Sequence, residues 1–235
     1  MQNKKMSAMT WPQIEKAFQE NYLVVIPLGA ACKEHGYHLP MNTDLIMAEK
    51  LADYVMSKYH QVLIAPPIID SYFPVFIEYP GSLSLTLETA TEVIVQRCQL
   101  WYQQGAKKFY VINNGISTNT PLKAAKMMLE KTCQDIQFHY LDLTPLHDDP
   151  RVVSIMEQKM GTHADEIETS MMMVVAPEVV QLEKAVPEES RNFSVSQSGA
   201  FGNPTLATKE KGEIGLAVLH EMIEKDLAVF KLERQ

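Results

Sequence analysis

Residues 25–44 read VIPLGAACKEHGYHLPMNTD, a short apolar run that leads into a loop dense in ionisable side chains. The run from Leu23 to Ile26 predicts a buried strand, which Pro27 and Gly29 end. Carboxylates and imidazoles are ligands of divalent ions, and sites in open α/β sheets lie outside the carboxyl ends of the strands. A solvated loop is the better explanation of any single histidine here, but the whole cluster favours metal binding: Lys33, Glu34, His35, His38 and Asp44.

Apolar periodicity along the rest of the chain predicts strands that alternate with helices. Strands are predicted at residues 23–27, 61–65, 108–112 and 136–142. Helices are predicted at residues 10–21, 44–59, 87–104, 119–131, 150–160 and 208–232, and an apolar helical run follows residue 168. This alternation predicts one domain over residues 1–235 with an α/β fold, a three-layer α/β/α sandwich around a mainly parallel central sheet. The loops at 66–86 and 184–207 are long enough to hold further strands.

The composition argues against several classes of protein. The chain has 21 basic and 29 acidic residues, a net charge of −8 and no basic cluster, which argues against binding to nucleic acid or to an anionic membrane surface. No apolar run approaches the roughly 18–20 residues that span a bilayer, and the first residues do not resemble a secretory signal. The 3 cysteines have no paired spacing, so we expect free thiols and a cytoplasmic protein.

A second group of ionisable residues lies in the sequence THADEIETSMMMVV, which begins at residue 162. Acidic side chains are favourable at a helix N-terminus, and this effect suffices to explain Asp165 and Glu166. Glu168 lies one helical turn before two methionines, so we expect it near the buried side of the helix. Glu168 is therefore the first candidate for a metal ligand in this group, and His163 is the second.

Two loops are candidates for contacts with a substrate. The aromatic residues of the loop at 66–86 predict either the wall of a substrate pocket or a subunit interface, and the residues do not decide between them. The loop NNGISTN at 113–119 lies between a strand and a helix, where backbone N–H groups bind an anion or stabilise an oxyanion. A simple capped turn explains the same spacing.

Five ordered segments resemble the creatininase (creatinine amidohydrolase) family. They are PLGA…HGYHLPMNTD, YPGSLSL, VINNGISTN, HADEIETS and GAFGNPTLATKEKG. The resemblance covers most of the chain. It implies a single creatininase-like domain with two divalent ions, hydrolysis of a small amide by metal-activated water, and homo-oligomers, commonly hexamers. By motif position it also implies that Asp44 bridges the ions and that His35 and Glu168 are ligands.

The sequence departs from the family pattern at two expected ligand positions. Lys33 replaces the glutamate of E-Q-H-G, and Ile116 replaces the histidine of N-G-H-x-x-N. Glu34 follows directly, and a bulge at residues 30–33 would turn it into the site. His163 is expected either to replace the missing ligand or to act as a proton shuttle.

We therefore predict a metal-dependent amidohydrolase that cleaves a C–N bond of a small amide, including a cyclic one. The predicted cofactor is zinc or manganese, one or two ions per subunit. The predicted residues are metal ligands Glu34, His35, Asp44 and Glu168; catalytic residues His163, Glu34 and Ser117; and substrate contacts Tyr79, Ser82 and Thr118. The alternative is a non-catalytic member of the family that kept the fold as a binding or assembly protein.

Overall fold

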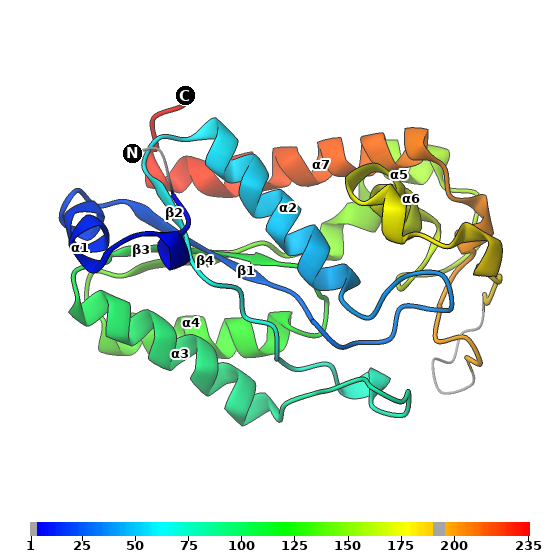
Figure 1. Ribbon diagram of the computed structural model, residues 1–235, viewed down its shortest axis with the longest axis horizontal. Coiled ribbons are helices and arrows are strands. Elements are labelled where there is room, and N and C mark those ends of the chain that lie inside the picture. Colours follow the sequence, from blue (N-terminus) through cyan, green and yellow to red (C-terminus); the bar gives the residue numbers. More distant parts are fainter. Residues whose placement is uncertain (1–3, 190–195) are drawn as a thin grey trace.

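The computed structural model describes residues 4–189 and 196–235, which form a four-stranded sheet between helices (Figure 1). The strand order is β2-β1-β3-β4, and every pair of neighbouring strands is parallel. The strands are β1 (Leu23–Leu28), β2 (Val62–Ile64), β3 (Lys108–Asn113) and β4 (Gln137–Tyr140). The predicted parallel sheet is therefore confirmed.

Helices cover both faces of the sheet (Figure 1). One face carries α2 (Thr43–Lys58), α5 (Pro150–Ile155), α6 (Glu166–Val175) and α7 (Lys209–Leu227). The opposite face carries α3 (Leu87–Gln103) and α4 (Asn119–Thr132), and α1 (Trp11–Gln19) packs into the same core. The predicted three-layer α/β/α architecture is confirmed.

The alternation of side chains along β1 explains the two cores. Leu23 and Val25 belong to the core under α2, α6 and α7, whereas Val24 and Ile26 belong to the core under α3 and α4. Successive residues of a strand point to opposite faces, and both faces of this sheet are covered. For this reason β1 is apolar throughout instead of alternating with polar residues.

Some expected elements are shorter or absent. The helix from residue 150 ends at Ile155, because the next backbone N–H groups, of Glu157 and Gln158, donate to the side chain of Glu166. The described parts of the loops at 66–86 and 184–207 form isolated bridges and no strand. Residues 190–195 of the second loop lie outside the described part of the chain. No helix of the described part has the length and apolarity needed to cross a membrane.

Gly29 allows the first turn of α2 to press against the end of β1. A Cβ atom at this position would lie 2.3 Å from the carbonyl oxygen of Asp44. Only glycine permits so close an approach of two backbone segments. The contact holds Asp44, at the start of α2, beside the carboxyl end of the central strand.

Candidate metal site

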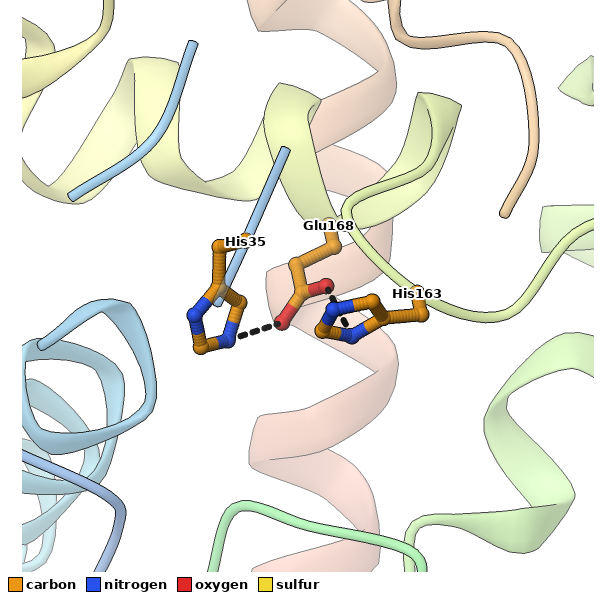
Figure 2. Close-up of side chains that lie close together, drawn as sticks. All are labelled: His35, His163 and Glu168. Carbon is orange, nitrogen blue, oxygen red and sulfur yellow. Dashed lines mark ion pairs between the residues drawn. The ribbon is translucent and has the colours of Figure 1, made fainter. Parts of the chain in front are cut away.

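Three donor side chains converge where the loop after β1 lies beside the N-terminus of α6 (Figure 2). His35 comes from the loop after β1, His163 from the loop before α6, and Glu168 from the first turn of α6. His35 Nε2 lies 3.8 Å from Glu168 Oε1, and His163 Nδ1 lies 4.0 Å from Glu168 Oε2. All three donor atoms lie within 4.8 Å of one another. Neighbouring ligands of one tetrahedral zinc ion are about 3.4 Å apart at zinc–ligand bonds of about 2.1 Å, so a small closure suffices.

Hydrogen bonds to backbone carbonyls determine the tautomer of both imidazole rings. His35 Nδ1 lies 2.9 Å from the carbonyl oxygen of Lys33, and His163 Nε2 lies 3.0 Å from that of Glu34. A carbonyl oxygen only accepts, so these nitrogens carry the protons and donate. In a neutral ring the opposite nitrogen then presents its lone pair, and in both rings that nitrogen faces Glu168. Metal-bound imidazoles are oriented in this way.

Two carboxylates lie near His35 Nε2, an arrangement that favours a cation at this position. This nitrogen lies 3.0 Å from Asp44 Oδ1 in addition to its approach to Glu168. A neutral ring that donates through Nδ1 has no proton for either carboxylate. Either the ring is an imidazolium or a cation lies on Nε2. The donor set of two imidazoles and carboxylates therefore fits a divalent ion such as zinc or manganese.

Asp44 is buried and is held between cationic and hydrogen-bonding partners. Its Oδ2 lies 2.6 Å from Lys33 Nζ, and its Oδ1 accepts a bond from Asn114 Nδ2 at 3.3 Å. Burial alone would raise the pKa of Asp44, but the Lys33 ammonium and His35 hold it well below the ordinary value. The carboxylate therefore remains ionised.

Lys33 fills the space that aromatic residues enclose beside Asp44. Its side chain is only 5% exposed, and its Nζ lies 4.9 Å from the ring centroid of Phe76 and 5.5 Å from that of Phe73. An ammonium over an aromatic face is attracted by the ring quadrupole. The aromatic loop at 66–86 thus encloses a cation.

Glu34 lies on the far side of His163 from Glu168. Its Oε2 lies 3.2 Å from His163 Nε2, and its Oε1 accepts a hydrogen bond from the backbone N–H of Gly36. Burial raises the pKa of Glu34, but the bonds from His163 and Gly36 outweigh this and lower it. A Cβ at Gly199 would lie 2.1 Å from Glu34 Oε1, so the carboxylate packs directly against that glycine. The structure does not bring Glu34 into the three-residue donor group.

A cavity of about 270 Å³ opens beside the donor group. Polar residues that line it include Lys33, Asp44, Asn114, His147, His163 and Glu168. Its remaining wall is mainly apolar and includes Met47, Val75, Phe76, Ile116, Leu143, Leu146, Met171 and Leu219. Such a cavity accommodates a small molecule whose polar group faces the donors.

Ser117 and Thr118 lie in the loop after β3 but differ in their access to the cavity. Ser117 lines the cavity, and its hydroxyl donates to the carbonyl oxygen of Tyr72 at 2.8 Å. Thr118 is fully buried, and its hydroxyl bonds to Gly115 and Asn113 within its own loop. The predicted anion-binding turn is thus held together by its own side chains.

Tyr79 and Ser82 support the loops around the site. The Tyr79 hydroxyl donates to the carbonyl oxygen of Ser196 at 2.9 Å. Ser82 Oγ accepts from the backbone N–H of Glu34 at 2.9 Å. Neither residue lines the cavity.

His38 lies next to the donors in sequence but serves a different contact. Its Nε2 lies 2.8 Å from Thr169 Oγ1, which ties the loop to α6. Burial, the main cause, lowers the pKa of His38 to about 4. The ring is therefore neutral near pH 7 and acts as a structural hydrogen-bonding group.

His147 is a cavity residue that the sequence analysis missed. Its Nε2 lies 3.1 Å from Asp165 Oδ2, and Asp165 is completely buried. Burial lowers the pKa of His147, but the bond to Asp165 outweighs this and raises it. No motif marks His147, and its role depends on the buried Asp165, because a buried acid requires a partner.

Comparison with known proteins agrees with this geometry. The sequence model of the creatininase family, described as creatinine amidohydrolase, matches residues 7–227. The chain therefore belongs to the creatininase family of hydrolases.

Relatives within the family have different substrates. A 3-dehydro-scyllo-inosose hydrolase of Thermotoga maritima is 24% identical over 253 residues, 92% of this chain and 80% of that protein. A mycofactocin precursor peptide peptidase of Mycolicibacterium smegmatis is 24% identical over 213 residues, 81% of this chain and 78% of that protein. A solved structure described as creatininase Mn superposes with a TM-score of 0.80 at 22% identity, covering 96% of this chain and 98% of that one. This superposition confirms the fold.

Proposed function

We propose that the protein is a metal-dependent hydrolase that cleaves the C–N bond of a small amide. The observation that carries the proposal is the orientation of the His35 and His163 rings. One nitrogen of each ring is bonded to a backbone carbonyl, and the other nitrogen faces Glu168. Membership of a hydrolase family supports it, as does a relative described as a manganese creatininase.

Each residue of the cavity has a role in this proposal. His35, His163 and Glu168 would hold a zinc or manganese ion, and Asp44 Oδ1 lies beside the ring nitrogen of His35 that would bind it, 3.0 Å from Nε2. When bound there, the ion would supply Lewis-acid chemistry, the activation of water and the polarisation of a carbonyl group near neutral pH. The apolar wall that includes Phe76 and Ile116 excludes bulk water from the substrate.

The proton-transfer role moves from His163 to His147 in this proposal. The contacts of His163 use one ring nitrogen for Glu34 and direct the other toward Glu168. His147 lines the same cavity, and Asp165 orients its ring as a carboxylate orients a catalytic imidazole. His147 is therefore the group we expect to protonate the leaving nitrogen.

The test is an amide panel assayed with metal-depleted protein before and after zinc or manganese is added back. The panel contains creatinine, small formamides, cyclic amides and short peptides. We expect hydrolysis of at least one class, lost on depletion and restored by metal. The Glu168→Gln variant removes a donor at nearly constant volume and should not be restored.

A second candidate is a non-catalytic binding or assembly protein. Lys33 and Ile116 at two expected ligand positions favour it. Tight metal binding without hydrolysis of any panel member would support this candidate against the first. We also propose a homo-oligomer, with a hexamer as the first expectation, which light scattering of the purified protein tests.

A further inference from the structure

We propose that the Lys33 ammonium takes the place of a second metal ion, so that each site combines one divalent ion with one cation built into the chain. This inference rests on the proposed metal site and specifies its composition. It is argued from the contacts of Asp44, from the available donors and from the charge of the cluster.

The two oxygens of Asp44 face two different cationic positions. Oδ1 lies 3.0 Å from His35 Nε2, beside the donor group, and Oδ2 lies 2.6 Å from Lys33 Nζ. A carboxylate that bridges two ions presents one oxygen to each. In this chain one of the two positions already contains an ammonium group.

The surroundings of Lys33 offer no donor set for an ion. Among the described residues, the group of histidine, cysteine and acidic side chains able to hold an ion consists of His35, His163 and Glu168. Glu34 is turned toward His163 and Gly36, and Phe73 and Phe76 lie near the Lys33 ammonium. Aromatic rings attract an ammonium but do not ligate zinc or manganese.

The charges of the cluster balance with one divalent ion. Glu34, Asp44 and Glu168 are the carboxylates around the donor group, and Lys33 is the ammonium paired with Asp44. With neutral imidazoles these groups leave an excess of about two negative charges, which a single divalent ion neutralises. A second divalent ion would leave an uncompensated positive charge in a buried site, which is unfavourable.

The ammonium also gives the cavity a permanent hydrogen-bond donor. Lys33 lines the cavity, and an ammonium has three N–H groups. The ammonium forms an ion pair with Asp44, and its N–H groups would also donate to a carbonyl or anionic oxygen of a ligand. Lys33 would then carry out the electrophilic part of the work that a second ion performs in a two-ion site.

The experiment counts zinc by elemental analysis after incubation with excess zinc and removal of the unbound ion. The proteins are wild type, the neutral control Lys33→Met and the double variant K33E/I116H, which places ligand types at both altered positions. We expect one ion in wild type and in the control, and two in the double variant. Circular dichroism of each protein establishes that it is folded.

Each result separates this inference from the proposed function. Two ions in wild type, or one ion in a folded double variant, would overturn the inference and leave a metal hydrolase intact. No ion in wild type would refute the metal-dependent function and the inference together. If the double variant does not fold, the zinc content of the wild-type protein alone tests the inference, which requires one ion per chain.

Discussion

Replacement of Lys33 by methionine tests the buried ion pair directly. Methionine keeps an unbranched side chain against Phe73 and Phe76, so the packing changes little and the charge is lost. In metal-free protein the change leaves the ionised Asp44 carboxylate without the ammonium 2.6 Å away. Removing one partner of a buried pair costs about 3–5 kcal/mol.

We place the cost at the lower end of this range, because Asp44 keeps its contacts with His35 and Asn114. A loss of about 3 kcal/mol corresponds to a fall in Tm of about 6–12 °C for a chain of this size. The assay is urea unfolding of chelator-treated protein, followed by circular dichroism.

A double-mutant cycle with Asp44→Asn provides the control. The variant with both changes removes both charges, so we expect it to be more stable than Lys33→Met alone. The reasoning is refuted if Lys33→Met costs less than about 1 kcal/mol, which is the size expected of a solvent-exposed ion pair. It is also refuted if the double variant is no more stable than the single one.

Three further predictions concern other parts of the site. Gly29→Ala should destabilise the protein by about 1–3 kcal/mol in urea unfolding, because its Cβ would lie 2.3 Å from a backbone oxygen of Asp44; unchanged stability would contradict the close packing. The pKa of His38 is about 4 in the folded protein and about 6.5 in the unfolded chain. Between these values the unfolded state binds more protons, so the free energy of unfolding falls as the pH decreases from about 6.5 to 4. His38→Gln should lose about 3 kcal/mol of that pH dependence, and an unchanged pH profile would show that the ring is not buried in its neutral form. His147→Gln should lower kcat at least about 100-fold on any substrate found in the panel and leave the zinc content unchanged, whereas loss of the ion would make His147 a ligand.

The apolar pattern of the chain was sufficient to predict the layers. The run around Val24 and Val25 is apolar at successive positions, which is the pattern of a strand covered on both faces. The alternation of such runs with helical stretches predicted a parallel sheet. The end of the helix at Ile155 was not predictable, because it depends on backbone bonds to a side chain 8 and 9 residues further on.

The candidate site was only partly predictable for a physical reason. His35 and Asp44 follow β1 closely, and Glu168 and His163 were candidates from a distant segment because they lie at the start of a predicted helix, Glu168 one turn before two methionines. The direction in which Glu34 points depends on Gly199, more than 160 residues away, against which its carboxylate packs. The position of His147 depends likewise on its long-range partner Asp165. Contacts between distant segments leave no periodic signal in the sequence.

The lysine beside Asp44 has a consequence for the supply of metal in the cell. At low free metal, the occupancy of a site that requires two exchangeable ions varies with the square of the metal concentration. With one cation attached covalently to the chain, occupancy varies only in direct proportion. On the single-ion composition proposed above, a tenfold scarcity of metal would reduce the active fraction about tenfold instead of about a hundredfold, by the mass-action dependence of ligand binding.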